Sequence, residues 1–105
     1  MLKWYKNLYV GDTAKKKMNK IIWKINHGAG MIDVYLVTLP VSEQNQLEII
    51  SSSQILQKPL RRLCPMIVGV ACGYAEAVDL VLHMTQEVYQ ATGTAEIRTY
   101  LESKM

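Results

Sequence analysis

Residues 66–73 read MIVGVACG, and this stretch decides how the rest of the chain can fold. Every position from Met66 to Cys72 is apolar or glycine, so no side of the segment is polar. A run of this length, ended by Gly73, is typical of a strand that is covered on both faces of a sheet. We therefore expect a central strand here, with the other elements packed around it.

The residues that follow predict a long helix and then another strand. Between Tyr74 and about Thr92, apolar residues recur at helical intervals, and Gly93 suits the left-handed position that closes a helix. Over residues 94–101, apolar and polar residues alternate, as in a strand with one exposed face. A strand, a helix and a strand in this order form a right-handed crossover, which would make the two strands parallel.

Upstream, residues 31–41 and 47–52 predict two strands joined as a hairpin by a polar turn. The first of them is apolar on both faces, so it too should lie centrally in the sheet. The loop 53–65 that follows contains two prolines and carries three basic residues, Lys58, Arg61 and Arg62. Loops on rigid scaffolds often carry recognition, which makes these basic residues candidates for binding.

Residues 13–27 predict the first helix, capped by Asp12 or Thr13 and ended by Gly28. Its apolar residues follow a 3.6-residue period and would form the buried face: Ala14, Met18, Ile21, Ile22 and Ile25. Its polar face carries five lysines: Lys15, Lys16, Lys17, Lys20 and Lys24. Residues 1–11, which show no clear period, form either a short strand or a packed arm.

These elements predict one α+β domain over residues 1–105, in the order α-β-β-β-α-β. We expect a two-layer sandwich in which both helices cover one face of a four-stranded mixed sheet. The opposite face would then expose Tyr35, Val37 and Leu39, which need cover from the amino-terminal arm or from a second copy. An exposed apolar patch of this kind is typical of an interface, so we expect self-association, most simply a homodimer.

Composition supports a folded domain and indicates its cellular location. Half of its 105 residues are hydrophobic and the net charge is +3, which permits a nucleic-acid partner without implying one. No apolar stretch approaches the ~20 residues of a membrane span, and residues 1–10 are too polar for a signal peptide. Cys64 and Cys72 are then expected as reduced thiols in a cytoplasmic protein.

The lysine face, joined by Arg61 and Arg62, is the candidate site for a polyanion such as DNA, RNA or lipid phosphate. We expect no aromatic residue interleaved there to stack on a base. The bland alternative is that the lysines are solvated, or are offset by acidic residues of the second helix: Glu76, Asp79 and Glu87.

Two further features carry weaker chemical hypotheses. His83 shares a helical stripe with those acidic residues, which could hold a metal but is equally explained by surface pairs at i,i+4 spacing. Cys72 precedes a helix amino terminus, where a thiol pKa can fall, although a free cysteine is more commonly a small buried hydrophobe. The glycines around residues 69–73 lack the spacing of a nucleotide-binding loop. We expect no catalytic, cofactor or metal site.

Three segments resemble a family of small proteins from anaerobic Firmicutes whose function is not known: IIWKI at residues 21–25, DVYLVTLP at residues 33–40, and residues 69–77. The resemblance extends over about residues 8–101 and rests on core and turn positions. It implies a single-domain bacterial protein, and it brings no activity, cofactor or catalytic residue.

The first hypothesis is therefore a non-enzymatic binding or regulatory module that acts through a surface and self-associates, or binds a protein partner. The alternative is a nucleic-acid-binding accessory protein that uses the lysine face. An enzyme built on Cys72 or His83 ranks third.

Overall fold

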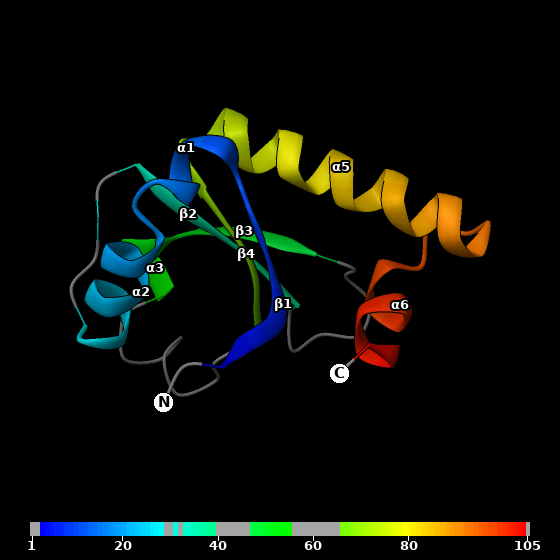
Figure 1. Ribbon diagram of the computed structural model, residues 1–105, viewed down its shortest axis with the longest axis horizontal. Coiled ribbons are helices and arrows are strands. Elements are labelled where there is room, and N and C mark those ends of the chain that lie inside the picture. The colour runs from blue at the N-terminus through cyan, green and yellow to red at the C-terminus, as the bar shows by residue number, and fades with distance from the viewer. Residues whose placement is uncertain (1–2, 29–30, 32, 40–46, 56–65, 105) are drawn as a thin grey trace.

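The uniformly apolar stretch forms β4 (Met66–Cys72), which lies inside a four-stranded mixed sheet of order β1-β4-β2-β3. The computed structural model describes residues 3–28, 31, 33–39, 47–55 and 66–104 (Figure 1). β4 runs parallel to β1 (Trp4–Val10) and antiparallel to β2 (Val34–Leu39). Because both of its faces are covered, residues 67–71 are all buried, which confirms the predicted central strand.

The predicted α+β class, central second strand and hairpin are also confirmed. β2 lies between β4 and β3 (Glu48–Ser51), and β2 and β3 are antiparallel, with Leu36 opposite Ile50. The predicted turn between them, residues 42–46, lies outside the described residues. A single helical turn, α3 (Ser52–Ile55), follows β3.

The predicted helices are found with small differences. α5 (Tyr74–Thr92) ends at Gly93, whose φ of 78° is the left-handed conformation expected there. The first helix is divided into α1 (Asp12–Lys15) and α2 (Met18–Asn26) by a turn at Lys16 and Lys17, and Gly28 has the positive φ expected after it.

The predicted element order is wrong at the carboxyl end and leaves out a strand at the amino end. Residues 4–10 form the edge strand β1, which is one of the two alternatives for the amino terminus. The predicted last strand is instead the helix α6 (Ile97–Ser103). The stretch fits both periods, because Ile97 and Leu101 are four residues apart. A spacing of four places two side chains on one side of a helix and also on one side of a strand. The place beside β4 is taken by β1, so the last segment packs as a helix against Tyr5, whose hydroxyl donates to the Leu101 carbonyl at 3.2 Å.

The two helix layers lie on opposite faces of the sheet, so the predicted two-layer sandwich with both helices on one face is wrong. α1 and α2 pack through Ala14, Ile21 and Ile25 on the face that carries Leu36 and Val70. The other face, which carries Val37, Leu39, Val68 and Ala71, is covered by α5 and α6 (Figure 1). Two central strands that are apolar on both faces require a helical layer on each side.

This arrangement also overturns the predicted self-association face. Val37 and Leu39 are buried beneath α5 and α6, and Tyr35 is half-buried, with its ring edge-on to that of Tyr74 at 5.7 Å between centroids. The missing cover therefore comes from this chain itself. Within the described residues, no helix combines the length and apolar character that crossing a membrane requires.

Candidate functional site

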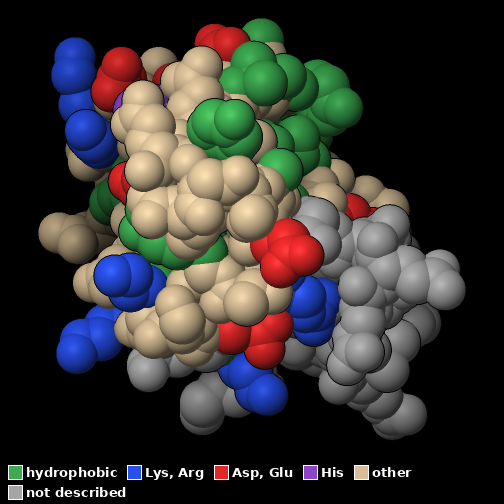
Figure 2. Space-filling model, turned by 90° about the vertical axis from the view of Figure 1, so that its right-hand side faces the viewer, with side chains coloured by type: hydrophobic (Ala, Val, Ile, Leu, Met, Phe, Trp, Pro, Cys, Tyr) green, Lys and Arg blue, Asp and Glu red, His purple; other side chains and the backbone are tan. Residues whose placement is uncertain are grey.

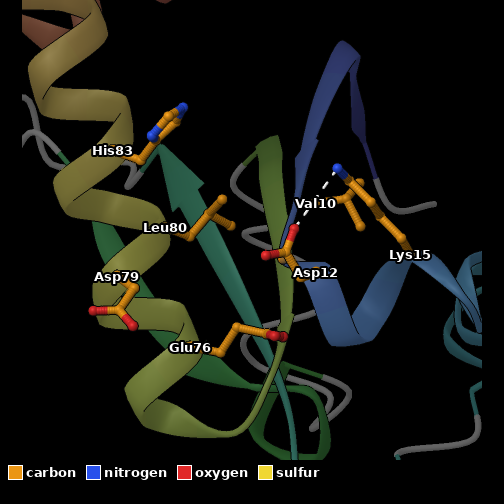
Figure 3. A pocket seen from close by; sticks show the side chains of 8 residues that line it. Val10, Asp12, Lys15, Glu76, Asp79, Leu80 and His83 are labelled. Atoms are coloured by element: carbon orange, nitrogen blue, oxygen red, sulfur yellow. Dashed lines mark ion pairs between the residues drawn. The ribbon is translucent and has the colours of Figure 1, made fainter.

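The connections that leave the two parallel strands go to opposite faces of the sheet. The chain passes from β1 into α1 on one face and from β4 into α5 on the other. Ligand crevices of open α/β sheets form at such points, outside the carboxyl ends of the strands. A cleft of about 550 Å³ lies there, between α1 and α5 (Figure 3). Its lining comprises Val10, Gly11, Asp12, Lys15, Glu76, Asp79, Leu80 and His83.

Glu76 lies in this cleft but is committed to holding the fold together. Its carboxylate accepts the backbone N–H of Cys72 at 2.6 Å and that of Thr13 at 2.9 Å. Burial raises the pKa of Glu76, but these donors outweigh burial, and the net pKa lies below its usual value. A Cβ on Gly11 would stand 2.6 Å from the carboxyl carbon, so only glycine lets the Glu76 side chain reach both donors. Glu76 thus ties α5 to the end of β4 and to the start of α1.

The remaining polar groups of the cleft do not converge on a reactive centre. Asp12 and Lys15 form an exposed ion pair at 3.8 Å, while Asp79 and His83 are exposed on α5 (Figure 3). Glu87, which was expected on one helical stripe with His83, accepts a short hydrogen bond from the Tyr9 hydroxyl. In the part of the chain that the structure describes, no three acidic, histidine or cysteine side chains are grouped so as to hold a metal ion.

The Cys72 thiol is not activated by its position. Burial and the nearby Glu76 carboxylate raise the pKa of the thiol above its usual value, which contradicts the predicted possibility of a lowered pKa at this strand end. The side chain packs, half-buried, against the core on the α2 side of the sheet. Cys64 lies outside the described residues.

The lysine face belongs to the α1–α2 layer. Lys15, Lys16, Lys17 and Lys20 are exposed and Lys24 is half-buried. Among the described residues, Lys15 is the one lysine of this face with an ion pair. Because α5 covers the opposite face of the sheet and the ion pair of Lys15 is with Asp12 of its own helix, the expected offset between the lysines and the acidic residues of α5 is wrong. Arg61 and Arg62, and Lys58 with them, lie outside the described residues.

An aromatic side chain stands on this lysine face, contrary to expectation. Trp23 is 59% exposed, three residues after Lys20 and next to Lys24. Its ring stacks on the His27 imidazole with centroids 4.0 Å apart, and His27 Nδ1 donates to the Trp23 carbonyl at 2.6 Å. The sequence held the signal, because Trp23 falls outside the buried series of Ile21 and Ile25 at helical spacing.

We define the basic aromatic face by its exposed or half-exposed side chains on this layer: Lys16, Lys17, Lys20, Trp23, Lys24 and His27. Comparisons with protein-family models, with curated proteins and with solved structures found no match to this chain. The resemblance to a Firmicutes family accordingly stays a prediction.

Proposed function

We propose that this protein is a small non-enzymatic binding module whose ligand is a single-stranded nucleic acid, bound on the basic aromatic face. The observation that carries the proposal is Trp23, a large aromatic side chain that is 59% exposed among lysines. An aromatic side chain in that position normally costs solubility and contributes nothing to the core. Its placement is accounted for if a ligand covers it.

The chemistry of the face matches the two parts of a nucleic-acid strand. Lysines neutralise phosphates, and the release of counterions makes such binding weaken as salt rises. Aromatic rings stack on bases, each stack contributing about 1–3 kcal/mol. His27 lies against the Trp23 ring, so a base on the other ring face would extend an existing stack. Stacking of this kind requires an unpaired base, which favours a single strand over a duplex.

The environment of the candidate catalytic side chains supports a binding role rather than catalysis. Glu76 and Glu87 are engaged in hydrogen bonds within the fold, and the pKa of Cys72 is raised. A cytoplasmic location, expected from the sequence, is compatible with a nucleic-acid ligand.

The test is binding of a fluorescein-labelled 15-nucleotide oligo-dT strand, followed by fluorescence anisotropy over a range of salt concentrations. Trp23→Ala should weaken binding roughly 5- to 150-fold, which corresponds to one stacked base at 1.4 kcal/mol per tenfold. Trp23→Phe, which keeps a ring, should retain most of the affinity. Asn19→Ala, an exposed change on the same helix, is the matched control.

Two results would contradict the proposal. One is equal affinity of the wild type and Trp23→Ala for the strand. The other is equal binding of the strand and of heparin, with no effect of Trp23, which would indicate a general polyanion surface. A duplex of oligo-dA and oligo-dT should bind more weakly than the single strand.

A further inference from the structure

His27 is the histidine of the basic aromatic face, and histidine is the side chain whose charge ordinarily changes between about pH 5 and pH 8. It directly follows α2, and its side chain is exposed to solvent. The ring lies on that of Trp23, with 4.0 Å between the centroids and 22° between the ring planes. A change in the charge of His27 therefore occurs beside the side chain on which a base is proposed to stack.

The hydrogen bond between His27 and Trp23 determines which ring nitrogen takes up the proton. His27 Nδ1 lies 2.6 Å from the Trp23 carbonyl oxygen. A carbonyl oxygen can only accept, so Nδ1 carries a hydrogen in the neutral ring as well as in the charged one. Nε2 is therefore the nitrogen that gains the proton. Its protonation leaves both the hydrogen bond and the stack on Trp23 in place.

A positive charge on His27 is compatible with its place at the end of α2. The backbone N–H of His27 donates to the carbonyls of Trp23 and Lys24 at 3.1 and 3.2 Å, so the residue belongs to the last turn of the helix. The helix dipole places partial negative charge at this end. The face of the Trp23 ring also attracts a cation.

The charged imidazole has no acidic partner within the described part of the fold. On α2, its charged neighbours are Lys20 and Lys24, which at 100° per residue lie on the same side of the helix as His27. Outside the basic aromatic face, the charged residues described between positions 3 and 55 are Lys3, Lys6, Asp12, Lys15, Asp33 and Glu48. Among all the described residues, no carboxylate forms an ion pair with His27. A phosphate of a bound ligand would supply the missing partner.

A strand bound as proposed brings phosphates to this place. A base on the free face of the Trp23 ring carries phosphates on both sides of its sugar, and His27 lies against the opposite face of that ring. The protonated Nε2 is a donor, so it can form a charge-assisted hydrogen bond to a phosphate oxygen. The neutral Nε2 can only accept, and it therefore offers a phosphate no hydrogen bond.

We infer that His27 is a phosphate contact of the basic aromatic face and makes the binding of a single strand depend on pH, with tighter binding when Nε2 is protonated. This inference rests on the proposed function, to which it adds a second contact residue and a form of regulation. A fall in pH would strengthen binding without a change in the fold or in the stack on Trp23.

His83 provides an internal control, because it is the other histidine of the chain. It lies on α5, which covers the opposite face of the sheet, and Asp79 lies one turn before it on the same helix (Figure 3). On the side of the molecule where α5 ends and α6 lies, basic and acidic side chains are interspersed (Figure 2). A strand attracted by the lysines of α2 is therefore not expected to respond to the charge of His83.

The test is binding of a 15-nucleotide oligo-dT strand at about pH 5.5 and about pH 8, at one salt concentration, because thymine does not titrate in this range. A rhodamine label, whose emission does not depend on pH here, reports the anisotropy. The dissociation constant of the wild type should be about two- to fivefold lower at the lower pH, as for one exposed ion pair gained. His27→Phe keeps a ring against Trp23 but cannot be protonated, so it should lose this gain. His83→Phe should retain it.

A second measurement uses the free protein. Nitrogen-15 NMR of the imidazole rings, assigned with the two variants, should show the hydrogen of His27 on Nδ1 at the higher pH and on both nitrogens at the lower pH. A neutral ring with its hydrogen on Nε2 would contradict the inference. Circular dichroism at both pH values verifies that each variant is folded.

The outcomes separate this inference from the proposed function. If the wild type binds the strand equally at both pH values while Trp23→Ala still weakens binding, the inference is overturned and the proposed function stands. The inference is also overturned if His27→Phe gains as much affinity in acid as the wild type. Absence of strand binding at both pH values would refute the proposed function, and this inference with it.

Discussion

At the scale of single residues, Glu76 shows how a group inside a cleft can serve structure instead of chemistry. Its position on α5, on one helical stripe with Asp79, His83 and Glu87, suggests a ligand for a metal or a substrate. In the structure its side chain lies against Gly11, and its carboxylate accepts hydrogen bonds from two backbone N–H groups. No local pattern reveals the bond with Thr13, which is 63 residues away in the chain, whereas Cys72 is a local partner four residues before Glu76.

Replacing Glu76 with Gln should therefore destabilise the fold and change its response to acid. One of the two backbone donors would face an amide that cannot accept, so we expect a loss of about 1–3 kcal/mol in urea unfolding at pH 7. Because the folded pKa of Glu76 is lowered, its stabilisation is present above the unfolded pKa of about 4.3 and disappears as the pH falls through the folded value. The two proteins should converge in stability in acid.

The control for this change is Glu96→Gln at an exposed position, which should alter stability by less than about 0.5 kcal/mol. A deficit of Glu76→Gln that persists unchanged at pH 2 would show that the loss is not electrostatic.

At the scale of elements, residues 94–101 show the limit of periodicity. Strand alternation and one helical face both account for Ile97 and Leu101, and over so short a segment the two patterns overlap. Residues 66–72 and 74–92 have no such ambiguity. The first is uniformly apolar and short, and the second repeats its helical period over five turns before Gly93 ends it.

Thr99, exposed within α6, distinguishes helix from strand through the sign of one substitution. Alanine favours a helix over threonine by roughly 0.5 kcal/mol, whereas in a strand threonine is the better residue. We expect Thr99→Ala to raise the unfolding free energy slightly and Thr99→Val to leave it unchanged or lower it. The reverse order in chemical denaturation would indicate that this segment is a strand after all.

At the scale of the whole molecule, the layers separate a basic helix from an acidic one. The α1–α2 layer carries the five lysines, while α5 carries three acidic residues and no lysine or arginine. The sequence pattern predicts these helices side by side, where their charges would offset each other. In the structure the helices cover opposite faces of the sheet, and among the described residues these lysines form no ion pair with an acidic residue of α5.

Neutralising the lysines should accordingly affect binding and not stability. The triple variant Lys16→Gln, Lys17→Gln and Lys20→Gln should change the unfolding free energy by less than about 0.5 kcal/mol. Its binding of oligo-dT should lose roughly 0.7 of salt-dependence slope for each phosphate contact removed. A destabilisation of several kcal/mol would instead mean that these lysines are paired within the fold.

By itself, the sequence determined the central strands, the long helix with its glycine end, the hairpin and the α+β class. Each follows from which side chains avoid water, and the period of apolar residues records this locally. Only the tertiary structure decided which face of the sheet each helix covers and that residues 97–103 form a helix. The pattern of apolar residues in the sequence indicates which side chains must be buried. Which element buries them depends on contacts between segments far apart in the chain.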